Sequence, residues 1–131
     1  MTTPHHPDSR LADCWTELMQ PLGFSARSLW LMLEPDGTPG PLMEIPGLPS
    51  SPLGAADVLI PLLSQLADDI GDLGVAFLLT RPGDGLPDSD DLGWGVQLRV
   101  ASQAAGLRCA GVHLAHDTAV QPLPHRSLRA A

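Results

Sequence analysis

The sequence predicts an α/β fold, a two-layer or three-layer sandwich with a mixed central sheet of about five strands and three helices. Helical periodicity and short apolar runs alternate along the chain, in the order helix, two strands, helix, strand, helix, two strands. Turn residues separate these segments. The length of 131 residues suits one domain. We expect this domain to span residues 8–121, between flexible tails at 1–7 and 122–131.

The first half is predicted to hold a helix, a hairpin and a second helix. Asp8 or Ser9 can cap the first helix, which ends before Pro21. Apolar runs at 28–34 and 41–45 flank a Pro-Asp-Gly turn and predict a hairpin. The prolines at 46, 49 and 52 indicate a connecting loop, with a PxxP ligand as the alternative. An apolar stripe over 54–73 predicts the second helix, and Pro61 inside it predicts a kink or a late start.

The second half is predicted to hold a buried strand, a third helix and two more strands. Residues 74–80 are continuously apolar, as in a central strand covered on both faces. Asp88 can cap a helix that ends at Gly106, although period-two alternation from Trp94 to Val100 leaves a strand as the alternative. Strands are expected at 107–115 and 118–121, joined by a turn at His116 and Asp117.

Charge and composition narrow the possible partners. Seven basic residues, all arginine, face 15 acidic ones, for a formal charge of −8. Such a surface disfavours nucleic acid and anionic membranes but allows protein partners. The chain has no apparent signal peptide, no apolar run of about 18 residues and only two cysteines, so we expect a cytoplasmic protein. The absence of lysine, asparagine and tyrosine indicates a GC-rich genome, as in many bacteria.

The common catalytic motifs are absent, and no cofactor is expected. There is no GxGxxG, P-loop, GxSxG or HExxH motif. The loop "PGDGLPDSDD" lacks the spacing of a calcium site, and its aspartates are read as helix caps rather than as an acid/base pair. Cys109 and His113 should share one strand face, but His116 falls out of phase with them. They do not predict a zinc site, and His113 is expected to be a partly buried strand residue.

The stretch "LLTRPGDGLPDSDDL" carries a resemblance to a known family. A strand, a proline corner, a Gly/Asp loop, an acidic-capped helix and then "GLRCAGVHLA" follow in an order that resembles the JAB/MPN domain. This is the metalloprotease fold of deubiquitinating isopeptidases, with bacterial relatives of the RadC type and a cytidine-deaminase-like architecture. The resemblance covers residues 28–121 in arrangement and is sharpest over 76–114.

The resemblance implies where a metal site would lie. In the family, two histidines of an HxH motif and a later aspartate bind zinc, and a glutamate acts as general acid and base. The matching positions are Leu79 and Arg81 for the histidines, Asp91 for the aspartate and Glu44 for the glutamate. Asp88 or Ser89 takes the place of a serine that begins the family's helix motif. Nine residues separate Arg81 from Asp91, where the family has ten.

These matches imply an inactive form of the family. Leu79 has no donor atom, and the guanidinium of Arg81, directly before Pro82, is a fixed cation that cannot bind zinc. We therefore expect Arg81 to pair with Asp91, and with Glu44 if that residue lies near, in place of a metal ion.

The functional expectation is a non-catalytic scaffold that binds another protein or forms a homodimer. Trp30, Trp94 and the proline-rich loop are the predicted interface, with burial of both tryptophans in the core as the alternative. A hydrolase using His113, His116 or Cys109 is a second hypothesis. A small acidic chaperone-like domain is a third.

Overall fold

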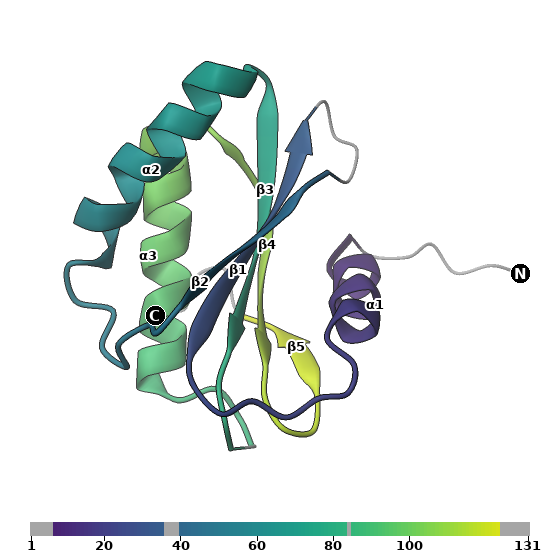
Figure 1. Cartoon of the computed structure of the whole chain (residues 1–131). Coiled ribbons are helices and arrows are strands. Elements are labelled where there is room, and N and C mark those ends of the chain that lie inside the picture. The colour runs from purple at the N-terminus through teal and green to yellow at the C-terminus, as the bar shows by residue number, and fades with distance from the viewer. Residues whose placement is uncertain (1–6, 36–39, 84, 124–131) are drawn as a thin grey trace, which may run out of the picture.

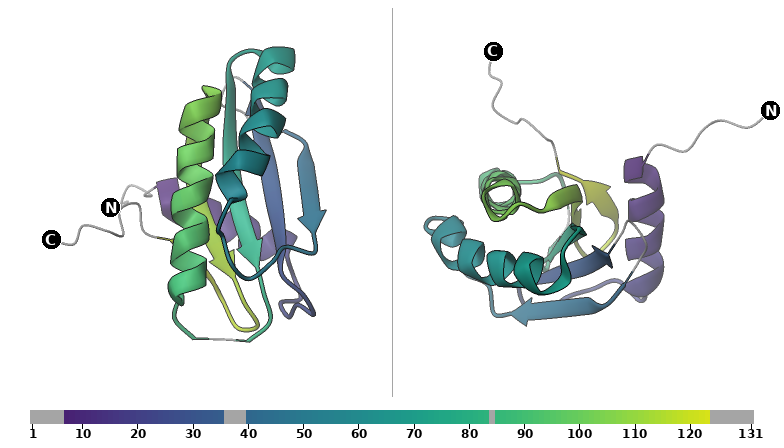
Figure 2. Two further views of the ribbon diagram at one scale, coloured as in Figure 1. Left: turned by 90° about the vertical axis from the view of Figure 1, so that its left-hand side faces the viewer. Right: turned by 90° about the horizontal axis from the view of Figure 1, so that it is seen from above.

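The computed structural model describes residues 7–35, 40–83 and 85–123, which form three layers (Figure 1). The predicted α/β class and the predicted order of elements are confirmed. Helices α2 and α3 cover one face of a sheet, and α1 lies on the opposite face (Figure 2). The helices are α1 (Pro7–Leu18), α2 (Ala55–Ile70) and α3 (Ser89–Ala105). The strands are β1 (Ser28–Pro35), β2 (Leu42–Pro46), β3 (Leu73–Thr80), β4 (Arg108–Ala115) and β5 (Val120–Pro122).

The sheet is mixed and has the strand order β2-β1-β3-β4-β5. β3 and β4 are parallel, and the other neighbours are antiparallel. β3 occupies the centre, and all eight of its residues are buried. Its apolar sequence requires cover on both faces, which α1 on one side and α2 and α3 on the other provide. The predicted hairpin of β1 and β2 is also present.

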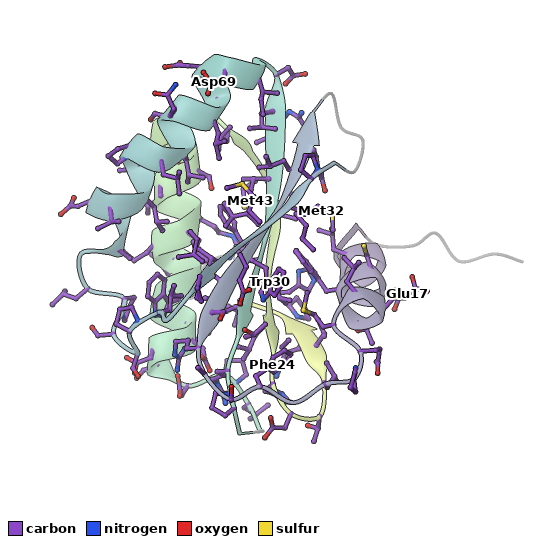
Figure 3. All side chains as sticks on the ribbon, viewed as in Figure 1. Glu17, Phe24, Trp30, Met32, Met43 and Asp69 are labelled. Atoms are coloured by element: carbon purple, nitrogen blue, oxygen red, sulfur yellow. The ribbon has the colours of Figure 1, made fainter. Side chains whose placement is uncertain are left out.

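The two faces of the sheet carry separate apolar clusters. The larger one fills the space between the sheet and α2 and α3, and it includes Leu63, Phe77 and Leu98. The smaller one lies beneath α1 and centres on Trp15. Figure 3 shows Met43 toward α2 and Met32 toward α1, on opposite sides of the sheet. The alternation of side chains along the strands thus sorts the apolar residues into two layers.

The stretch for which the sequence allowed either a helix or a strand forms helix α3. Asp88 caps it, and Gly106 ends it in the left-handed conformation at φ 80°. The period-two pattern from Trp94 to Val100 therefore does not form a strand. A Cβ on Gly93 would lie 2.7 Å from Cγ of Pro52, so glycine lets the helix approach the proline-rich loop.

α2 is continuous from Ala55 to Ile70 despite Pro61. The late start allowed by the sequence is therefore wrong. Pro61 lies on the exposed side of the helix, where Leu62 and Val58 are also exposed. Leu59 and Leu63 on the other side enter the larger cluster. The helix thus follows the amphipathic stripe rather than the local preference of proline.

The first helix begins earlier and the last strand begins later than the sequence predicts. α1 already includes Pro7, Asp8 and Ser9, so the expected cap residues lie within the helix. β5 is shifted toward the C-terminus relative to the predicted strand. Leu123 is buried and donates its backbone N–H to Val112, so the ordered chain extends past residue 121. Residues 1–6 and 124–131, which make up most of the tails predicted at 1–7 and 122–131, lie outside the described residues, as does the turn at Asp36 and Gly37. No helix within the described ranges is long and apolar enough to cross a membrane.

A matched pair of leucine variants tests the inner face of α2. Leu63→Ala removes a fully buried side chain and is expected to lower the free energy of unfolding by about 2–5 kcal/mol. Leu53→Ala makes the same change at a position that is 90% exposed and should cost less than about 0.5 kcal/mol. Leu53 lies in the turn just before α2. Urea denaturation measures both values, and equal losses would contradict the burial of Leu63.

Candidate functional site

Three charged side chains from distant parts of the chain meet where β3 ends and α3 begins. The Nε of Arg81 donates to both carboxylate oxygens of Asp91, at 3.1 and 3.0 Å, and Nη2 lies 2.9 Å from Oδ2. Arg27, which precedes β1, donates from Nη1 to Oδ1 of Asp91 at 3.1 Å. Asp91 is fully buried, and Arg81 is 8% exposed. The predicted pairing of Arg81 with Asp91 is therefore present. We name Arg27, Arg81 and Asp91 the corner cluster.

The start of α3 holds the Asp91 carboxylate in place. Asp88 accepts a hydrogen bond from the backbone N–H of Asp91 at 2.9 Å, and its own N–H donates to Oδ2 of Asp91 at 2.9 Å. These two bonds form a reciprocal capping box. Asp91 thus accepts hydrogen bonds from two arginines and one backbone amide. A carboxylate offers about four lone-pair sites, so little acceptor capacity is left for a metal ion or a substrate.

The protonation of Asp91 follows from its neighbours. Burial raises the pKa of its carboxyl group, but hydrogen bonds from Arg81, the Asp88 amide and Arg27 outweigh burial and leave the pKa below its usual value. The hydrogen bond to Asp91 correspondingly raises the pKa of Arg81, against the opposing effect of burial. Asp91 is therefore an anion at neutral pH, and the pairing stabilises the fold in that form.

The loop between β3 and α3 is anchored by the turn between β4 and β5. Asp117 donates its N–H to the carbonyl oxygen of Gly83 at 2.8 Å, and its Oδ2 accepts from the Gly83 N–H at 2.9 Å. Its other oxygen accepts from the backbone N–H of Phe24 at 3.3 Å. Nε2 of Gln121 donates to the carbonyl oxygen of Gly85 at 3.3 Å and lies 3.0 Å from Nε2 of His116. The turn itself is predicted by the sequence, but its role in holding the loop is not.

The other family positions do not join the corner cluster. Leu79 is fully buried in the larger core. Glu44 is exposed on the edge strand β2 and pairs in register with Trp30, which packs toward α1. Glu44 forms no ion pair with Arg81 among the described residues, so the conditional pairing of these two residues is not present. Pro82 is exposed at the corner itself.

The histidines and Cys109 do not form a shared site. A β-bulge between Val75 and Ala76 shifts the register of β4. Cys109 consequently packs against the larger cluster, whereas His113 lies between Val112 and Leu114, which both point into that cluster. His113 therefore faces the opposite side, and the expected common face is wrong. His116 is buried, and its ring is hydrogen-bonded to Thr118 and Gln121. Among the described histidine, cysteine, aspartate and glutamate residues, no three lie together as a possible metal site.

The predicted interface tryptophans have different environments. Trp94 is buried in the larger core, and its Nε1 donates to the carbonyl oxygen of Ser50 at 3.1 Å. Trp30 is only partly buried on the face of the sheet that carries α1. Trp94 thus fits the alternative expectation of a core residue, and Trp30 retains some surface for a partner.

The corner cluster offers no evident chemistry. Its carboxylate is inaccessible and engaged, and neither Leu79 nor Arg81 can bind zinc, so the metal positions implied by the resemblance do not fit a metal ion. Comparison of the chain with protein-family models, with characterised proteins and with solved structures gives no match. The resemblance to the JAB/MPN domain therefore stays a prediction. What the geometry supports directly is a structural role for the cluster.

The first test of the corner cluster removes one cation. Arg81→Ala leaves a buried carboxylate with only Arg27 as an ionic partner and is expected to lower the free energy of unfolding by about 3 kcal/mol. Arg108→Ala is the control, because Arg108 and Asp72 form an ion pair with side chains 52% and 68% exposed. It should cost less than about 1 kcal/mol. Urea denaturation at pH 7 compares the two, and an unchanged midpoint for Arg81→Ala would remove the structural role.

The second test follows the titration of Asp91. Because folding lowers its pKa, its ionisation stabilises the fold fully above the unfolded pKa of about 3.9, and this contribution is lost as pH falls through the folded pKa. The difference in unfolding free energy between the wild type and Asp91→Asn should be constant above about pH 5 and should shrink below about pH 4. Urea denaturation from pH 7 to pH 3 measures this difference. A difference in unfolding free energy that grows toward acid pH would show that folding raises the pKa of Asp91 instead of lowering it.

Proposed function

We propose that this chain is a non-catalytic domain of the JAB/MPN-like type that acts as a protein-interaction scaffold. The supporting observation is that the Asp91 carboxylate accepts hydrogen bonds from Arg27, Arg81 and the backbone amide of Asp88. Asp91 is the position at which the resemblance implies a zinc ligand. A fixed cation replaces the charge that a metal ion would supply. The corner thereby keeps its structural function without a metal centre.

The alternative functions have less support from the geometry. A hydrolase built on Cys109, His113 and His116 needs side chains that converge, but the bulge in β4 separates Cys109 from His113. The ring of His116 is buried and bonded to its own turn. A chaperone-like role rests on the acidic composition alone.

A homodimer in the cytoplasm is part of the proposal. Trp30, Leu42 and Glu44 lie on the same face of β1 and β2, and Leu42 is exposed. α1 packs over β4 and β5 on that face, which leaves the β1–β2 side for a second copy (Figure 2). Cys14 and Cys109 pack in clusters on opposite sides of the sheet, so they cannot pair with each other and the fold does not depend on an oxidising compartment.

Elemental analysis of the purified untagged protein, beside its mass by light scattering, tests the proposal. We expect no stoichiometric zinc and a mass of two chains. Leu42→Asp should give the mass of one chain, because it places a carboxylate in the proposed contact next to Glu44. Zinc at one ion per chain would contradict the non-catalytic proposal, and a monomeric wild type would contradict the dimer.

A variant with restored histidines serves as the positive control for the metal measurement. Leu79→His/Arg81→His supplies the two donors that the resemblance implies and releases Asp91 from one arginine. If the family positions are matched correctly, this variant should bind one zinc ion, whereas each single variant should bind it at least about tenfold more weakly. No gain in zinc binding by the folded double variant would argue against the family correspondence.

A further inference from the structure

An open apolar groove lies between α2, β2 and the loop that joins them. Its volume is about 540 Å³, within the range of about 300–1,000 Å³ typical of ligand pockets. Among the lining residues only Ser51 and Trp94 carry a polar side-chain group, and the indole N–H of Trp94 already donates to Ser50. The lining includes Leu48, Ser51, Leu53, Val58, Leu62 and Trp94.

The loop wall of the groove is held in place by several bonds. The indole N–H of Trp94 donates to Ser50, and the N–H of Leu48 donates to the carbonyl oxygen of Arg27 at 3.0 Å. At the far end of the loop, the N–H of Ala55 donates to Pro52 at 3.0 Å. These bonds tie the proline-rich segment to α3 and to the chain before β1. The groove is therefore preformed, which reduces the entropy cost of binding.

Apolar side chains project from the rim of the groove. Leu53 is 90% exposed and Val58 is 74% exposed, and Leu62 is also exposed on the next turn of α2. Three exposed apolar residues alone would be unremarkable on a protein surface, but here they border a cavity that is itself apolar. Together they form a continuous apolar surface that a partner can cover.

The charge around the groove points to a basic partner. No charged side chain lines it, and α2, which forms one wall, carries Asp57, Asp68 and Asp69 but no basic residue. Arg27 and Arg81 are both paired with Asp91. With a net charge of −8 for the whole chain, the surroundings attract cations and repel anionic ligands such as fatty acids.

The form of the partner follows from the edge strand beside the groove. β2 has five residues, and Pro41 and Pro46 flank or end it. Proline lacks the N–H needed to pair with an added strand, so these residues limit extension of the sheet by an extended peptide. A small polar molecule would find almost no side-chain hydrogen bonds. An amphipathic helix needs neither strand pairing nor polar contacts in the groove.

We propose that the groove binds an amphipathic helix of a partner protein, with apolar residues at i, i+3, i+4 and i+7 and arginine or lysine beside them. The apolar side chains enter the groove next to Trp94, and the basic ones lie toward Asp57 in the first turn of α2. This inference rests on the proposed scaffold function and names the partner class. The groove lies on the face of the sheet opposite to the proposed dimer contact.

A defined peptide and the full chain test this inference. The probe is a synthetic helix of about 12 residues with leucine at i, i+3, i+4 and i+7 and arginine at the flanking positions. Nuclear magnetic resonance can follow the indole N–H signals of Trp15, Trp30 and Trp94 during titration. We expect the Trp94 signal to shift most, because only this tryptophan lines the groove. Affinity should fall as salt is added.

Matched variants and peptides give the controls. Leu53→Asn/Val58→Asn removes exposed rim contacts without touching the core and should weaken binding by about tenfold or more. Val100→Asn changes an exposed apolar residue of α3 outside the groove and should leave binding unchanged. The same peptide with aspartate in place of arginine should bind at least about tenfold more weakly.

Three results would overturn the inference. The first is no binding of the arginine peptide to the folded wild type, and the second is equal binding of the arginine and aspartate peptides. The third is conversion of a wild-type dimer to a monomer by Leu53→Asn/Val58→Asn, which would make the groove the contact between two copies. Peptide binding by a protein that also holds stoichiometric zinc would support the groove while removing the non-catalytic proposal, so the two failures are distinguishable.

Discussion

The burial of the Asp91 carboxylate is the constraint on which the corner of the molecule depends. Moving such a charge out of water costs several kcal/mol unless partners compensate it. Here the compensation comes from Arg27 before β1, Arg81 after β3 and the amide of Asp88 at the start of α3. The cluster therefore joins three segments that are far apart in the sequence. It stabilises one geometry for the turn from the central strand into α3, because any other geometry would leave the charge unpaired.

The position of α3 in turn shapes the apolar groove. Gly93 allows the helix to approach Pro52, and Trp94 binds the carbonyl oxygen of Ser50. Both contacts fix the proline-rich loop against α3. Arg27 takes part at both places, since its side chain pairs with Asp91 and its carbonyl oxygen accepts from Leu48. The ion cluster and the groove are thus mechanically connected through α3 and the segment before β1.

The two proposed contacts divide the molecule between its two faces. The partly buried Trp30 and the exposed Leu42 lie on the side of α1, and the groove lies on the side of α2 and α3. A scaffold arranged in this way can pair with its own copy and still present one groove per chain to a basic helix, which an acidic surface attracts. Two grooves in one dimer would raise the apparent affinity for a bivalent partner without any new contact. Such a role requires a stable corner and no reactive group.

The sequence by itself determined the order of the elements, the central position of β3 and the Asp88 cap, because each follows from apolar periodicity or from local capping. The pairing of Arg81 with Asp91 was expected from the positions that the family resemblance implies. Only the tertiary structure decided the part played by Arg27, which lies 64 residues from Asp91. It also decided that a bulge in β4 separates Cys109 from His113 and that, among the described residues, Glu44 forms no ion pair with Arg81. The groove depends on packing among three segments as well. These features arise from long-range contacts, which periodicity and local chemistry do not encode.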